Sequence, residues 1–93
     1  MKLTSHEVYF IFKGDRMQTC IRELRLAAGL TQQQLAERVH VSARTIISIE
    51  MERYNPSLML AYRIARVFNT DIETLCCMEE NMKKEDAKYA ELS

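Results

Sequence analysis

Residues 32–51 read QQQLAERVHVSARTIISIEM, and this stretch decides the fold. Thr31 precedes it as a good helix N-cap, and Gln34 stands three residues later, where it completes a capping box. Ser42 is a second N-cap, so one helix ends and another begins within roughly three residues around His40. The stretch therefore predicts two short helices that cross at a steep angle.

Two helices that cross so closely need a small residue at their contact and apolar residues around it. Ala36 supplies the small contact, and His40 occupies the turn, where an adaptable backbone is needed. The remaining apolar positions at helical spacing are Leu35, Val39, Val41, Ile46 and Ile49. This arrangement is typical of a helix-turn-helix motif.

Further helices are predicted on both sides of the pair. Apolar residues at helical spacing cover 20–28, and Gly29 can take the left-handed conformation that closes a helix. A second apolar stripe covers 58–68, with Leu58 among its inward positions and Asn69 at its end.

A fifth, short helix is predicted after Asn69, where Thr70 and Glu73 fit a second capping box. Residues 79–91 (EENMKKEDAKYAE) are polar and predict a solvated or frayed helix that could become ordered against a partner. The chain as a whole is therefore expected to be an all-α five-helix bundle with a polar C-terminal tail.

Length and composition agree with this fold class. The chain has 93 residues, enough for one domain, and its 13 Lys and Arg balance 13 Asp and Glu. One Pro and two Gly leave few helix breakers, which favours helices over a small all-β domain. The longest apolar run, residues 8–12, is far shorter than the roughly 20 residues that a membrane helix needs. We therefore expect no membrane association.

The chain divides into three parts. Residues 17–76 form the expected domain, residues 77–93 an acidic tail, and residues 1–16 an N-terminal extension. Alternating side chains in residues 8–12 fit either a short strand or a disordered arm, and Met17 fits a natural start of the domain. Three cysteines, two of them adjacent, make a poor disulfide framework, and no cleavable signal precedes them, so the expected compartment is the cytoplasm.

The domain resembles the short bacterial and phage repressors of the Xre/Cro type. The resemblance extends from about Ile21 through the runs LRLAAGLTQQQLAERVHVSARTIISIE and YNPSLMLAYRIARVFNTDIETL, nearly sixty of the 93 residues. It includes Leu-Thr-Gln before the second helix, Ser-x-x-Thr-Ile at the third, and Asn-Pro-Ser-Leu before the fourth. The resemblance implies a lambda-repressor-like domain that binds operator DNA as a dimer, with its third helix in the major groove.

The helix that follows Ser42 has a definable outward side. If Ile46 and Ile49 are buried, a rise of 100° per residue turns the opposite side of the helix to solvent. The residues on that side that we expect to read bases are Ala43, Arg44, Ile47 and Ser48. Arg pairs with guanine, Ser bonds a base or a phosphate, and Ala or Ile contacts a thymine methyl, so Arg44 is the leading candidate for specificity.

Phosphate contacts are expected from polar groups around this helix. The resemblance implies that Gln32 holds a phosphate, and the further candidates are Gln33, Thr45, Arg53 and Arg22. The family also pairs an Arg at the end of the first helix with a Glu at the end of the third, which implies a structural pair of Arg25 and Glu50.

The sequence departs from the family at two turns. His40 stands where the family usually has Gly, and Met51 with Glu52 stands where Asn-Gly is common. The second departure removes a usual phosphate contact and adds a negative charge.

The run after the fifth helix is more apolar than one small subunit can easily bury. We therefore expect a dimer surface there, with Ile72, Leu75, Cys76, Cys77 and Met78 as its candidate residues. These cysteines and His40 lack the spacing of a zinc site, so no metal or other cofactor is expected.

Two functions remain at this point. The first is a homodimeric regulator, most simply a repressor, that binds double-stranded DNA at a pseudo-palindromic operator. The second is an antitoxin or adaptor that masks a protein partner through its acidic tail, with DNA binding secondary. An enzyme is not expected, because the sequence shows no nucleophile beside a base, no paired carboxylates and no glycine-rich phosphate loop.

Overall fold

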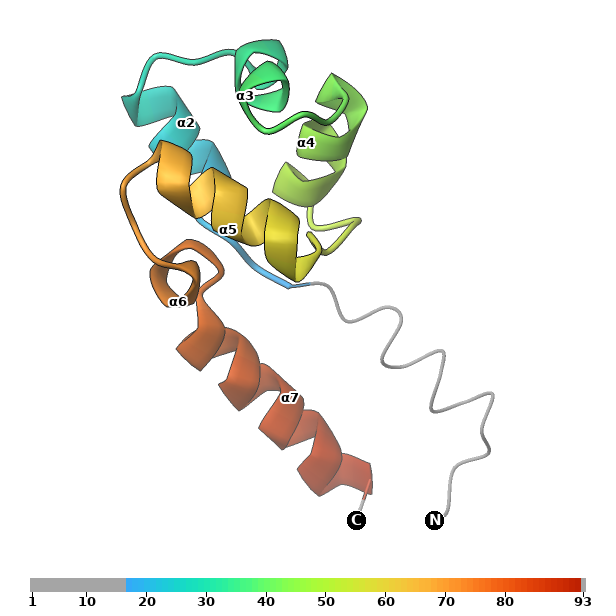
Figure 1. The fold of residues 1–93 in the computed structure, drawn as a ribbon. Coiled ribbons are helices and arrows are strands. Elements are labelled where there is room, and N and C mark those ends of the chain that lie inside the picture. The colour runs from blue at the N-terminus through green and yellow to red at the C-terminus, as the bar shows by residue number, and fades with distance from the viewer. Residues whose placement is uncertain (1–16, 93) are drawn as a thin grey trace.

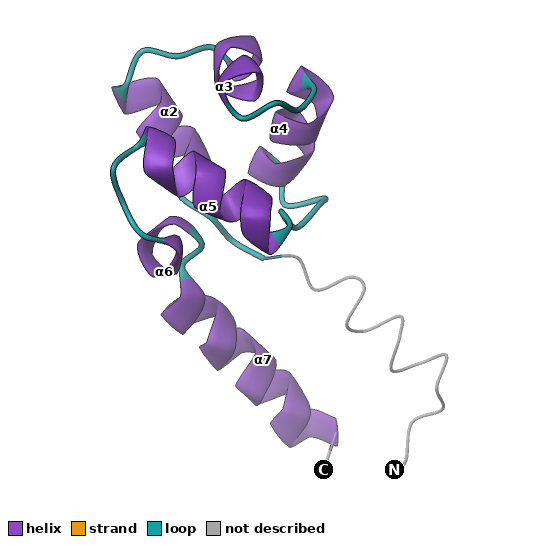
Figure 2. Cartoon of the chain, in the orientation of Figure 1, coloured by secondary structure: helices purple, strands orange, loops and turns teal. Residues whose placement is uncertain are grey.

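The computed structural model describes residues 17–92, which contain six α-helices (Figure 1). The helices, numbered from α2, are α2 (Ile21–Ala27), α3 (Gln32–Arg38), α4 (Ala43–Glu50), α5 (Leu58–Val67), α6 (Ile72–Leu75) and α7 (Met78–Leu92). Loops join them, and no strand occurs in this part of the chain (Figure 2). The all-α prediction is confirmed, whereas the predictions for residues 1–16 fall outside the described residues.

The helix N-termini follow the capping side chains. Thr31 and Gln34 form the predicted reciprocal capping box at α3, and the Ser42 hydroxyl accepts a hydrogen bond from the Thr45 amide at α4. Ser57 caps α5 in the same way through the amide of Leu60. These bonds satisfy backbone donors that the first turn of a helix otherwise leaves unpaired.

The predicted capping box at Thr70 is wrong. Asp71 caps α6 instead, and its carboxylate accepts a hydrogen bond of 2.7 Å from the Thr74 amide. The Thr70 amide donates to the carbonyl of Ala65 and so belongs to the closure of α5. Because Thr70 completes the preceding helix, the next one starts one residue later than the sequence pattern indicates.

The helices α2 to α6 all end through a residue with positive φ. Gly29 is the expected one, with φ of 70°, while the others are His40, Glu52, Asn69 and Cys77. At α3 and α4 the residue after the left-handed one closes the helix, since Val41 bonds to Ala36 and Arg53 bonds to Ser48. His40 therefore accepts the positive φ of the turn, which closes α3 as glycine would.

The core lies where α2, α3, α4 and α5 meet, and α6 closes its lower end (Figure 1). Its fully buried large side chains are Ile21, Leu35, Ile46, Ile49, Ile64, Leu75 and Cys76. Ala36 of α3 is buried, as predicted, and α3 packs against α4. The inward assignment of Leu58 is wrong: this residue is 72% exposed, and Leu60 takes the buried position one half-turn later.

The helix α7 leaves the body at the end remote from α3 and α4, and the molecule measures 48 × 23 × 20 Å (Figure 1). Asn81 anchors its base, because its side-chain amide bonds to the backbone of Gln18 at 2.8 and 3.0 Å and to the Cys76 carbonyl at 2.7 Å. Lys84 adds a bond of 3.1 Å to the Gln18 side chain. No helix in the described part of the chain is long and apolar enough to cross a membrane.

Candidate nucleic-acid interface

The outward side of α4 is the centre of the candidate interface. Ile46 and Ile49 are buried, so α4 is fixed against the core with Arg44 and Ile47 exposed and Ser48 partly exposed. Ala43 is different, because it is partly buried and packs against the core. The structure therefore leaves Arg44, Ile47 and Ser48 as the main outward groups among the four candidate base-reading residues.

A shallow hollow lies along one flank of α4. Its lining residues are Ser42, Arg44, Thr45, Ser48, Arg53 and Tyr54. The hollow thus unites two candidate base-reading residues with two candidate phosphate ligands, Thr45 and Arg53. The backbone explains why Arg53 reaches it, since its amide bonds to the Ser48 carbonyl at 2.8 Å and folds the chain back against α4.

A second hollow lies along the other flank. Its lining residues are Arg22, Arg25, Thr31, Gln32, Ile47, Glu50 and Met51. Arg22 of α2 and Gln32 of α3 are thereby placed beside Ile47 of α4, although they are far apart in the sequence. Cations and an amide group from α2, α3 and the loop after α4 thus flank the outward side of α4.

Arg25 and Glu50 fix the geometry of this second hollow. The Glu50 carboxylate accepts bonds from Arg25 Nε at 2.6 Å and Nη2 at 3.0 Å, and Arg25 Nη1 donates to the Leu30 carbonyl at 2.9 Å. Both side chains are nearly buried, at 9% and 3% exposure. The hydrogen bond to Glu50 raises the pKa of Arg25, which favours the charged guanidinium. The pair ties the end of α2 to the end of α4.

Gln32 belongs to the same network, because its side-chain nitrogen donates to Glu50 at 3.1 Å. This bond holds the Gln32 side chain at the start of α3 and uses one of the two hydrogens of its amide nitrogen. Gln33 is exposed and donates to Glu37 at 3.1 Å along α3. It does not line either hollow, so Gln33 lies apart from the other phosphate candidates.

Four residues at the interface lie outside the predicted site. Tyr54 and Ser42 line the first hollow, and Thr31 and Met51 line the second. Tyr54 has a sequence signal, an aromatic residue in a polar connector, whereas the sequence indicates only a capping role for Ser42. Glu52 stands nearby at φ 58°, exposed and next to Arg53, so it brings a negative charge to the border of the interface.

The predicted dimer run is mostly unavailable at the surface. Leu75 and Cys76 are 0% and 2% exposed within one chain, so their assignment to a free surface is wrong. Ile72 is partly buried against the core, and Cys77 is half-buried at a backbone turn. Desolvation raises the pKa of all three thiols, as expected of cysteines that pack as small apolar groups. Among the five candidates, only Met78 is largely exposed.

The comparisons with known proteins agree with this geometry. Residues 21–75 match a helix-turn-helix family model, HTH_3, and this segment spans α2 to α6. An uncharacterized HTH-type transcriptional regulator of Archaeoglobus fulgidus is 52% identical over 64 residues, which cover 69% of this chain and 91% of that protein. The immunity repressor protein of Bacillus phage phi105 is 35% identical over 69 residues, which cover 74% of this chain and 48% of the repressor.

A solved structure extends the likeness to three dimensions. The restriction-modification controller protein C.AhdI of Aeromonas hydrophila superimposes with a TM-score of 0.54 at 25% identity, over 76% of this chain and 97% of that one. The family match covers the helices that build both hollows. The chain therefore belongs to the helix-turn-helix family of transcriptional regulators, in its Xre/Cro type, and is a DNA-binding regulator.

Proposed function

We propose that the chain acts as a repressor that binds a pseudo-palindromic operator as a homodimer, with α4 in the major groove. One observation carries the proposal: the outward side of α4 holds Arg44, Ile47 and Ser48 and is bordered by two hollows with candidate phosphate ligands. Base contacts and backbone contacts are required together for specific recognition, and one surface offers both.

The roles of the residues follow from their chemistry. Arg44 pairs with guanine, Ser48 bonds a base edge or a phosphate, and Ile47 contacts a thymine methyl. Arg53 and Thr45 hold the backbone on one flank, and Arg22 and Gln32 hold it on the other. A dimer then reads two half-sites roughly 34 Å apart, one helical turn of DNA.

The low net charge of the chain sets the expected strength of binding. Residues 17–76 carry seven cations and six anions, so attraction to DNA rests on the local placement of a few arginines. We therefore expect a single domain to bind DNA weakly and a two-fold dimer to bind it more tightly. This requirement supports the dimer in the proposal.

The test is selection of bound sites from random duplex DNA at low salt, where phosphate contacts are strongest. We expect an enriched inverted repeat, and we expect Arg44→Ala to relax one position in each half-site. Lys83→Ala is the matched control, because it removes an exposed cation from α7, away from α4. The absence of any enriched sequence would reject DNA recognition and favour the protein-binding alternative.

A further inference from the structure

We infer that the homodimer forms by reciprocal exchange, in which α7 of each copy packs against the exposed side of α5 in the other. The inference deepens the proposed function, on which it rests for the two-fold partner. It identifies the two surfaces through which the copies contact each other. These surfaces are complementary in charge, and they are not joined to each other within one copy.

The first feature is the α5 face, a shallow surface formed by Arg38, Met59, Tyr62, Arg63, Arg66 and Val67. Met59 is 59% exposed, and the Arg66 guanidinium lies 5.9 Å from the centre of the Tyr62 ring. Within residues 17–92, none of the three arginines forms an ion pair. The α5 face therefore offers three cations around apolar and aromatic groups.

The second feature is the α7 hollow, which lies at the base of α7. Its apolar part consists of Met17, Met78 and Met82, and the carboxylates around it are Glu73, Glu79 and Glu85. Met82 is 55% exposed. Lys84 also lines the hollow but is bonded to Gln18, and Glu79 has only a loose, exposed contact of 3.6 Å with Lys83. Such an exposed pair contributes little, so the Glu79 carboxylate remains available to a partner.

The pattern of α7 concentrates these groups on one side. At 100° per residue, Met78, Met82 and Glu85 lie close together, with Glu79 and Asp86 beside Met82. Of the cations, Lys83 lies toward the back of the helix, Lys84 is bonded to Gln18 of the body, and Lys88 lies at the edge of the front side. The α7 side that continues the hollow is thus apolar and acidic, whereas the exposed side of α5 is apolar and basic.

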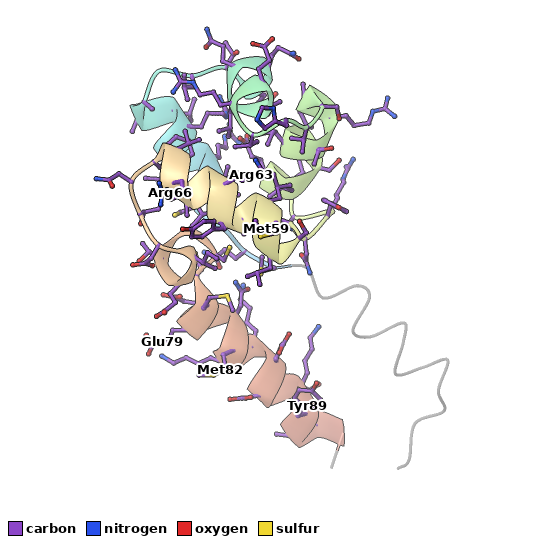
Figure 3. The ribbon with its side chains drawn as sticks, in the orientation of Figure 1. Met59, Arg63, Arg66, Glu79, Met82 and Tyr89 are labelled. Atoms are coloured by element: carbon purple, nitrogen blue, oxygen red, sulfur yellow. The ribbon has the colours of Figure 1, made fainter. Side chains whose placement is uncertain are left out.

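One copy does not bring the two features together. Figure 3 shows Met59, Arg63 and Arg66 on α5, and Glu79, Met82 and Tyr89 along α7 as it leaves the body. Within residues 17–87, no hydrogen bond or ion pair joins α5 to α7. With 15 residues, α7 is near the length of about 12–15 residues below which isolated helices are only marginally stable in water, so packing of its first turns against a partner would stabilise the helix.

A second copy fits this surface better than an unrelated protein, because the complementary face lies on the same chain. If α7 of one copy contacts α5 of the other, two-fold symmetry makes the same contact a second time and closes the assembly. The contact also leaves the DNA-reading side free, since α7 leaves the body away from α3 and α4 (Figure 1).

The test reverses the charges and measures the dimer by sedimentation equilibrium without DNA. We expect Arg63→Glu with Arg66→Glu to raise the dimer Kd by about tenfold or more, and Glu79→Arg with Glu85→Arg to do the same, because each places like charges in contact. The four substitutions together should restore the dimer, as should mixing the two double variants. Glu80→Arg with Glu91→Arg is the matched control on the back of α7 and should leave the Kd unchanged.

The outcomes separate this inference from its alternatives. A monomeric wild type, or a dimer insensitive to the two front reversals, overturns it, and circular dichroism checks that each variant keeps its helices. The test also distinguishes a partner copy from residues 1–16 as the occupant of the α7 hollow. A chain without residues 1–16 should still form the dimer, and its conversion to a monomer would overturn the exchange.

DNA binding is measured separately on the same proteins. A selected operator together with a charge-insensitive dimer rejects the exchange and leaves the proposed function in place. Rescue of the dimer by the fourfold variant, without any selected DNA sequence, supports the exchange and rejects the proposed function.

Discussion

The Glu50 carboxylate accepts two hydrogen bonds from the guanidinium of Arg25, at 2.6 and 3.0 Å, across a sequence separation of 25 residues. Gln32 donates a third bond to the same carboxylate, so the ends of α2 and α4 and the start of α3 are held at one point. Because Ile47 and Gln32 both border this point, the pair also positions one flank of the candidate interface.

Breaking this pair on one side should destabilise the fold strongly. We expect Arg25→Met to lower the free energy of unfolding by about 3–5 kcal/mol, because Glu50 would stay nearly buried without its main partner. Urea denaturation measures the change. The double variant Arg25→Met with Glu50→Leu should cost less than the sum of the two single changes, and strict additivity would show that the two side chains do not act as a pair.

Arg44 and Arg53 should differ in how their loss affects DNA binding. We expect Arg44→Ala to cost about 1–3 kcal/mol at one base position, and Arg53→Gln to weaken all sequences alike. Titration of an operator duplex at several salt concentrations tests this, since Arg53→Gln should reduce the salt slope by about 1. If Arg44→Ala instead weakens binding to all sequences equally, Arg44 contacts the DNA backbone and not a base.

Replacing Glu52 by Gly should improve both stability and DNA binding. Glu52 has φ of 58°, where a side chain costs roughly 1–2 kcal/mol, and its charge opposes DNA. Part of the gain is offset by the greater chain entropy of glycine, so we expect a rise in Tm of a few degrees. His40→Gly is the matched control, with φ of 62°, and should raise Tm without a similar gain in affinity. Equal gains in affinity would exclude a charge effect of Glu52.

The cap of α6 should be sensitive to acid. Hydrogen bonds from Thr74 lower the pKa of Asp71, so the ionised form is favoured in the folded state. Its contribution to stability is therefore present above the unfolded pKa of about 3.9 and is lost as the pH falls through the folded pKa. Amide exchange of Thr74 measures this loss. Asp71→Asn should keep the cap and remove the acid dependence, while Thr70→Ala should have little effect on α6.

The local structure could be predicted from the sequence because its determinants are close along the chain. The apolar spacing of Leu35, Ile46 and Ile49 and the caps at Thr31 and Ser42 define α3 and α4, and all of them depend on neighbours within a few residues. The same periodicity indicates which side of α4 faces outward. The predictions for Leu58 and Thr70 fail because each residue lies at the start of a helix, where a shift of one or two residues separates two equally good patterns.

The assembly of the site was decided only by the tertiary structure. Helical spacing cannot show that Arg22 and Gln32 lie beside Ile47, or that Tyr54 lies with Arg44, because these contacts depend on how the helices cross and how the loop after α4 folds back. Helical spacing also cannot show that Leu75 and Cys76 are buried within one chain while Met78 and Met82 stay exposed. Burial is a property of the packed domain. A sequence pattern therefore identifies the apolar residues, but it does not show whether the surface that covers them belongs to the same chain or to a partner.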